Sequence, residues 1–173
     1  MLKKMPVLIL VFCSACAFFR EPVLSAAQKG NWKKVSVLAG QNNNVNVSEA
    51  GGMTPLMLLV ERGNWDELNA VVSRAETKDI FQALEELSLL KQSPEYLALN
   101  ALLAAGADVN AADARGRTAL IIAAQKGNVI AVSILLKNNA DPSIRDMYHY
   151  AALSYAENQE IIRLLIQSEE RGN

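Results

Sequence analysis

The residues whose side chains suit catalysis or metal binding are few and far apart. His149 is the single histidine among 173 residues, and no cysteine lies near it in the sequence. A common zinc site needs several histidine, cysteine or carboxylate ligands around one ion. A Ser-His-Asp arrangement would combine His149 with Asp146 and either Ser143 or Ser154, but no strained nucleophile turn surrounds these serines. We therefore expect no catalytic residue, no metal site and no cofactor.

The charged residues do not suggest another kind of site. Adjacent glutamates occur at Glu85-Glu86 and Glu169-Glu170, and neighbours in sequence point in different directions on a helix. The net charge of −1, with 20% charged residues, provides no clustered positive field for nucleic acid. We expect neither a catalytic carboxylate pair nor a nucleic-acid partner.

The N-terminus has the layout of a secretory signal. Lys3 and Lys4 are followed by an apolar stretch at 6–12 and then by small residues at 13–17. Even when it is extended to Phe19, the apolar stretch is shorter than the roughly 20 residues that a membrane-spanning helix needs. We predict that residues 1–17 form a signal peptide and that the protein is exported.

The end of this signal contains both cysteines of the chain. Ser14-Ala15-Cys16 resembles a bacterial lipoprotein box, although Cys13 stands where that box usually has leucine. The resemblance implies that Cys16 is lipidated and anchors the protein to a bacterial membrane. Simple cleavage after Ala17 is the alternative, and it would leave a periplasmic protein.

Short motifs recur along the rest of the chain with a period of about 33 residues, a length typical of helical repeats. The sequence of 26–31 occurs again, letter for letter, at 123–128. Gly30 and Gly63 are one such period apart, and Gly127 follows Gly63 after nearly two periods. Apolar residues between these landmarks follow helical spacing, so the period predicts repeated helix-turn-helix units that stack on one another.

These motifs resemble ankyrin repeats from about residue 20 to residue 173. The resemblance covers Thr54-Pro55-Leu56, Thr118-Ala119-Leu120 and the Gly-Ala-Asp-Val-Asn sequence at 106–110. It implies an all-α, ankyrin-type helical repeat solenoid, which forms one domain over residues 20–173. We expect about five units, with boundaries near 20–46, 47–79, 80–110, 111–143 and 144–173.

The third of these units is expected to be irregular. It lacks the threonine-proline entry, and an apolar stripe over 78–92 predicts a lengthened first helix there. Elsewhere, Thr54, Thr118 and Ser93 are predicted to cap helix starts. Glycines 30, 63 and 127 are predicted to turn the chain between paired helices.

Resemblance to ankyrin repeats also implies binding to another protein through finger loops and a concave face. The matching fingers are residues 48–53, 112–117 and 145–150. Tyrosine and arginine are enriched at binding hot spots, which directs attention to the last two fingers. The candidate contact residues are Met53, Arg115, Arg117, Met147, Tyr148 and Tyr150. Alternatively, Tyr148 and Tyr150 cover the exposed end of the stack as part of a cap.

Three functions remain open on these grounds. The first is a monomeric, non-catalytic protein-binding scaffold of the bacterial cell envelope, with a partner that the sequence does not identify. The second is an accessory subunit that protects or assists an exported enzyme. The third is a small enzyme on an unusual scaffold, which would have to depend on His149.

Overall fold

The computed structural model describes residues 22–41, 43–73 and 92–172. The predicted signal peptide at 1–17, with Cys16, lies outside these ranges, as does most of the helix predicted at 78–92. The helices are α2 (Pro22–Gln28), α3 (Trp32–Ala39), α4 (Pro55–Arg62), α5 (Asp66–Ser73), α7 (Pro94–Ala104), α8 (Ala119–Gln125), α9 (Val129–Lys137), α10 (Ala152–Tyr155) and α11 (Gln159–Gly172).

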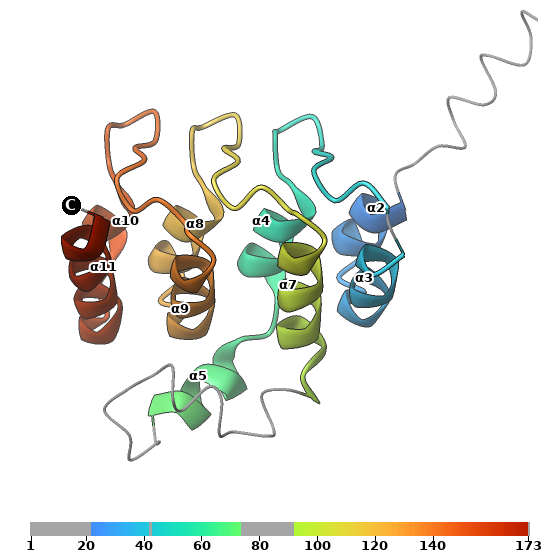
Figure 1. Cartoon of the computed structure of the whole chain (residues 1–173), viewed down its shortest axis with the longest axis horizontal. Coiled ribbons are helices and arrows are strands. Elements are labelled where there is room, and N and C mark those ends of the chain that lie inside the picture. The colour runs from blue at the N-terminus through green and yellow to red at the C-terminus, as the bar shows by residue number, and fades with distance from the viewer. Residues whose placement is uncertain (1–21, 42, 74–91, 173) are drawn as a thin grey trace, which may run out of the picture.

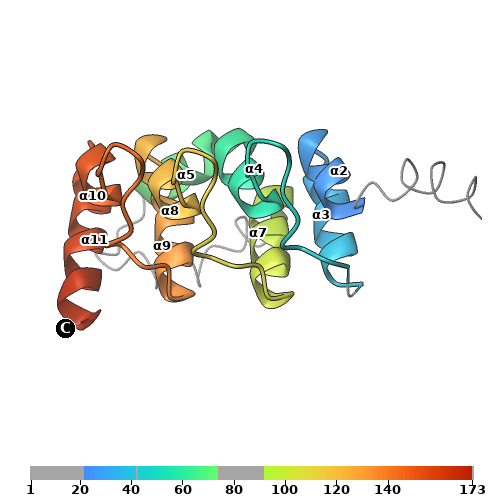
Figure 2. The ribbon, with the colours of Figure 1, turned by 90° about the horizontal axis from the view of Figure 1, so that it is seen from above.

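Most of these helices lie in two parallel rows (Figures 1 and 2). The inner row runs α2, α4, α8 and α10, and each of these helices contacts the next. The outer row contains α3, α7, α9 and α11, with direct contacts between α3 and α7 and between α9 and α11. The prediction of an all-α solenoid of stacked helix pairs is confirmed.

The described residues form four such pairs, whereas we expected about five units. The helix α7 was expected in a third unit at 80–110, but it packs against α3 and α4 and completes the second pair. The helix α5 was expected as the outer helix of the second unit, but it contacts α9 instead. The long interval from Gly63 to Gly127 therefore reflects an insertion between α4 and α7, not an additional repeat.

Gly63 corrects a second expectation, because the helix that follows it, α5, does not pair with α4. Its φ of −63° and ψ of 149° are extended, whereas Gly30 and Gly127 have a positive φ of 66°. A Cβ on Gly63 would lie 2.7 Å from the Leu59 carbonyl oxygen and 2.6 Å from Nε1 of Trp65. At this position glycine is needed for close contact, since the Trp65 indole donates to the same carbonyl at 3.2 Å.

The predicted helix caps are confirmed. The hydroxyl of Thr54 accepts from the Met57 N–H at 3.3 Å, and Ser93 accepts from the Tyr96 N–H at 3.1 Å. Thr118 caps α8 in the same way. A capping side chain of this kind contributes about 1 kcal/mol, so the start of each of these helices is set locally.

The core lies between the two rows of helices. Every residue of α8 from Ala119 to Ala124 is buried, and α4 is buried from Pro55 to Val60. Met57 and Ile121 stand where ankyrin repeats usually have histidine, and both are buried among apolar neighbours. Within the described ranges, no helix is long and apolar enough to cross a membrane.

Candidate partner-binding site on the finger loops

Three loops project from the inner row of helices at the predicted places (Figure 1). We call them finger 1 (residues 48–53), finger 2 (112–117) and finger 3 (145–150). A backbone hydrogen bond closes each finger between its second and last residues. The N–H to carbonyl pairs are Glu49 to Met53 at 3.1 Å, Asp113 to Arg117 at 3.0 Å and Asp146 to Tyr150 at 3.0 Å.

The fingers are also joined to one another through their backbones. The Ala114 N–H in finger 2 donates to the Gly51 carbonyl in finger 1 at 2.9 Å. The Met147 N–H in finger 3 donates to the Arg115 carbonyl in finger 2, also at 2.9 Å. These bonds hold the three loops in one row, so the backbones of neighbouring fingers keep fixed relative positions.

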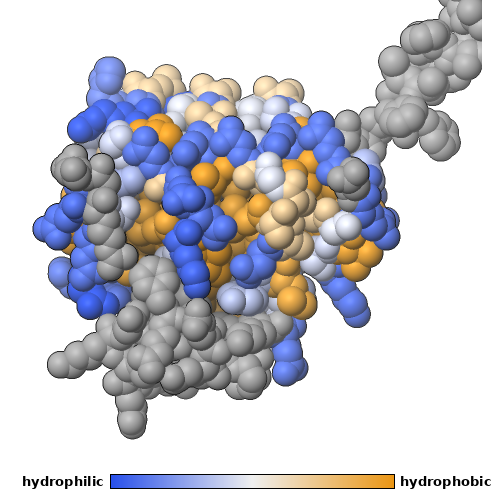
Figure 3. Space-filling model, viewed as in Figure 1, coloured by the Kyte–Doolittle hydropathy of each residue, from blue (hydrophilic) through white to orange (hydrophobic). Residues whose placement is uncertain are grey.

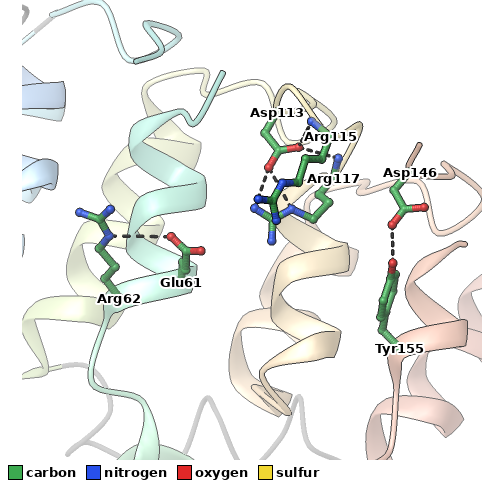
Figure 4. Close-up of polar contacts among 7 residues, drawn as sticks. All are labelled: Glu61, Arg62, Asp113, Arg115, Arg117, Asp146 and Tyr155. Carbon is green, nitrogen blue, oxygen red and sulfur yellow. Dashed lines mark hydrogen bonds and ion pairs between the residues drawn. The ribbon is translucent and has the colours of Figure 1, made fainter. Parts of the chain in front are cut away.

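A buried carboxylate organises finger 2. One oxygen of Asp113 accepts the backbone N–H groups of Arg115 and Arg117, each at 2.9 Å (Figure 4). The other oxygen accepts a hydrogen bond from Nε of Arg117 at 2.9 Å and lies 2.8 Å from Nη2 of the same side chain. The side chain of Arg117 is only 18% exposed. Arg117 therefore neutralises the carboxylate inside the finger and offers little surface to a partner.

A second buried carboxylate organises finger 3 without an arginine. One oxygen of Asp146 accepts the N–H groups of Tyr148 at 2.9 Å and Tyr150 at 3.1 Å. The other accepts the hydroxyl of Tyr155, which reaches it from α10 (Figure 4). The Tyr150 and Tyr155 rings also meet edge to face, with centroids 5.9 Å apart. Finger 3 is thus fixed to the last helix pair.

The tyrosine-carboxylate contact changes the acid-base properties of both groups. Burial alone would raise the pKa of Asp146, but the Tyr155 hydroxyl and the Tyr150 and Tyr148 N–H groups hold this pKa below its usual value. The same hydrogen bond, with burial and the negative charge of Asp146, raises the pKa of Tyr155 to about 12.

We expect Tyr155 to ionise at a higher pH than an ordinary tyrosine side chain. Because the folded-state pKa of Tyr155 is above the ordinary value of 10.0, its contact stabilises the fold at neutral pH. This stability is lost as the pH rises from 10.0 to about 12. Tyrosinate absorbance during a pH titration measures this directly, and Tyr155→Phe should remove the late step. A titration of the native chain that shows no late step would contradict the assignment.

The predicted contact residues fall into an exposed group and a buried group. Met147 and Tyr148 are each 60% exposed and Tyr150 is 54% exposed, while Arg115 also faces solvent. The tips of the three fingers carry moderately hydrophobic surface, which is pale orange in Figure 3. Met53, by contrast, is buried in the core at 7% exposure. We therefore do not include Met53 in the binding surface.

His149 has an uncommon backbone conformation but no catalytic arrangement around it. Its φ is +63°, and its carbonyl oxygen accepts a hydrogen bond from Nη1 of Arg145 at 2.9 Å. The Asp146 carboxylate is engaged by Tyr155 and does not accept a hydrogen bond from the His149 ring. No cluster of three or more histidine, cysteine or acidic residues that could hold a metal ion occurs in the described part of the chain.

The sequence analysis did not single out Asp113 or the structural role of Asp146. Both residues lie at the second position of their fingers, and Glu49 takes the same position in finger 1. An acidic residue that recurs with the repeat period was therefore a visible signal. Aspartate side chains commonly accept backbone N–H groups within turns, so its recurrence could have indicated how the fingers are built.

Comparison with known proteins agrees with this architecture. A family model described as ankyrin repeats (3 copies) matches residues 90–173. An ankyrin repeat-containing protein of Treponema pallidum (strain Nichols) is 26% identical over 142 residues, which are 80% of this chain and 47% of the relative. An L-asparaginase of Dirofilaria immitis is 33% identical over 123 residues, which are 61% of this chain and 21% of the relative.

A third relative is an ankyrin repeat protein of Fowlpox virus (strain NVSL), 34% identical over 100 residues, which are 54% of this chain and 15% of the relative. The chain spans less than half the length of each of these three relatives. It contains ankyrin repeats, and its fold is an all-α ankyrin-type solenoid. Ankyrin repeats form protein-protein interaction scaffolds and are generally non-catalytic.

Proposed function

We propose that this chain is a non-catalytic scaffold of the bacterial cell envelope that binds a partner protein through its finger loops and concave face. The observation that carries the proposal is the exposed group Met147, Tyr148 and Tyr150, with exposed fractions of 60%, 60% and 54%. Large apolar and aromatic side chains that gather on an exposed surface commonly mark a place where a partner binds. Arg115, on the adjacent finger, completes the proposed contact surface.

The rigidity of finger 3 argues against a purely structural role for these side chains. Tyr150 does contact Tyr155, as a cap residue would. Met147 and Tyr148, however, are each 60% exposed on a loop whose shape Asp146 already holds. A loop fixed before binding loses little conformational entropy when a partner docks, which favours affinity.

The double variant Arg115→Ala with Tyr148→Ala should reduce binding of the natural partner by at least about tenfold, as expected when hot-spot side chains are removed. The measurement is chemical crosslinking in native envelopes, followed by purification and mass spectrometry of the crosslinked partner. The matched control is Arg62→Ala with Val37→Ala, since both residues are exposed and lie away from the fingers. Equal recovery with both double variants, with unchanged circular dichroism, would place the partner elsewhere.

We further propose that the chain is exported and that Cys16 is lipidated. The positive residues Lys3 and Lys4, the short apolar stretch at 6–12 and the small residues before Cys16 support this proposal. Metabolic labelling with a fatty acid should mark the native chain and fail to mark Cys16→Ser. Label that persists in Cys16→Ser would rule out lipidation at this residue, and absence of label from the native chain would favour cleavage after Ala17.

The partial likeness to an L-asparaginase supports a second candidate function, in which the chain is an accessory subunit of an exported enzyme. The matched segment is 21% of that relative, so a similar segment exists within an enzyme chain. The two candidates differ in the crosslinked partner. An enzyme that loses activity faster in envelopes lacking this chain would favour the accessory role.

A further inference from the structure

The outward-facing charges of fingers 2 and 3 are all positive. Their two acidic residues, Asp113 and Asp146, are 8% and 5% exposed and accept hydrogen bonds within the stack. Arg117 is paired with Asp113. In the described residues, the guanidinium of Arg115 makes no hydrogen bond or ion pair, and Arg145 is also exposed. An external carboxylate would therefore meet unpaired positive charge at this place.

The finger that carries the unpaired arginine adjoins the finger that carries the exposed aromatic group. The Arg115 carbonyl accepts the Met147 N–H at 2.9 Å, so the two finger tips touch through their backbones. Met147, Tyr148 and Tyr150 follow one another closely on finger 3. An exposed guanidinium on one finger, with exposed apolar and aromatic side chains on the adjacent finger, suits a segment that carries an acidic residue near an apolar one.

Another finger, from a second copy of this chain or from a further repeat, fits this edge poorly. Fingers 1 and 2 approach their neighbours through Gly52 and Gly116, where a Cβ would lie 2.8 Å from Ala114 N and 3.1 Å from Met147 N. His149 stands at the equivalent position of finger 3, which is the fifth of each finger. A finger that approached finger 3 in the same way would meet the Cβ of His149, whose φ of +63° is positive like those of Gly52 and Gly116.

We propose that Arg115, Met147, Tyr148 and Tyr150 bind an acidic, apolar-containing segment of the partner protein. A carboxylate of that segment accepts hydrogen bonds from the Arg115 guanidinium, and an adjacent apolar side chain packs on Met147, Tyr148 and Tyr150. This inference rests on the proposed scaffold function and adds the chemical class of the segment that the scaffold recognises.

Fluorescence anisotropy of the full chain with short labelled peptides tests this specificity. The probes are three peptides with the same leucine and phenylalanine residues, in which the same positions hold glutamate, glutamine or lysine. The glutamate peptide should bind the native chain at least about tenfold more tightly than the lysine peptide. About 1 M NaCl, where the Debye length is about 3 Å, should remove most of this preference.

Two variants separate the roles of charge and apolar contact. Arg115→Glu should reverse the preference, so that the lysine peptide becomes the tighter ligand. Tyr148→Ala should weaken the binding of all three peptides without changing the order of their affinities. The matched control, Arg62→Glu, exchanges the same charge at an exposed arginine on α4 and should leave the order unchanged. Equal binding of the glutamate and lysine peptides, or a reversal caused by Arg62→Glu, would overturn the inference.

The outcomes distinguish this inference from the proposed function. Loss of the natural partner in Arg115→Ala with Tyr148→Ala, combined with no charge preference among the peptides, would retain the scaffold and reject the acidic segment. Sedimentation equilibrium tests the remaining possibility, which is that a second copy of the chain occupies this surface. Self-association of the native chain that Tyr148→Ala abolishes would identify a second copy as the occupant and would also reject the inference.

Discussion

Asp113→Ala should lower the free energy of unfolding by about 3 kcal/mol, because it removes the carboxylate partner of a largely buried cation. Asp113 accepts two backbone N–H groups and the Arg117 guanidinium, and these donors lose that acceptor in the variant. The Arg117 side chain is 18% exposed, so solvent replaces the lost contacts poorly. Urea denaturation followed by circular dichroism measures the change.

Glu160→Ala is the matched control for this prediction. It also removes the carboxylate partner of an arginine, Arg163. Here, however, the Arg163 and Glu160 side chains are 44% and 33% exposed. An exposed ion pair of this kind contributes less than about 1 kcal/mol. Similar losses in Asp113→Ala and Glu160→Ala would mean that burial of the Asp113 contact contributes little to the stability of finger 2.

Gly52→Ala should destabilise the stack by about 3 kcal/mol, through backbone conformation and through close contact between fingers. The φ of Gly52 is +77°, and an added Cβ would lie 2.8 Å from the backbone nitrogen of Ala114 and 3.0 Å from the Cα of Asp113. Both contacts are with backbone, so a side-chain rotation cannot relieve them. Fingers 1 and 2 would have to separate, which would weaken the hydrogen bond from Ala114 to Gly51.

Gly127→Ala isolates the conformational part of this loss. Its φ is +66°, but nothing lies within 4 Å of the Cβ that alanine would add. The expected loss is about 1 kcal/mol, which is the cost of a left-handed alanine alone. Both variants are compared by thermal and urea denaturation. Equal losses would show that the approach of finger 2 to finger 1 is not tight in solution.

The local features of the fold could be predicted because each depends on a few neighbouring residues. Thr54, Thr118 and Ser93 cap their helices through N–H groups in the first helical turn, and the finger boundaries follow from motifs that recur with the repeat period. Met57 and Ile121, apolar residues within the predicted helical units, are likewise buried. Such features need no knowledge of which helices become neighbours.

The repeat count could not be predicted in this way. The interval between Gly63 and Gly127 is nearly twice the repeat period, and it is compatible with two repeats or with one repeat and an insertion. The contact of α7 with α3, and of α5 with α9, distinguishes the two cases. These contacts join residues far apart in the sequence, and their partners are selected by the apolar surfaces that the whole stack has to bury.

The candidate site shows the same division between sequence and tertiary structure. Sequence alone determined that the chain would form stacked helix pairs with projecting fingers, and it placed arginine, methionine and tyrosine on the last two fingers. The tertiary structure decided which of those side chains a partner can reach. Arg115 and Arg117 are close neighbours in the sequence, yet only Arg117 is held through its guanidinium by the buried carboxylate of Asp113. Exposure depends on contacts in three dimensions, and residue type and spacing do not specify it.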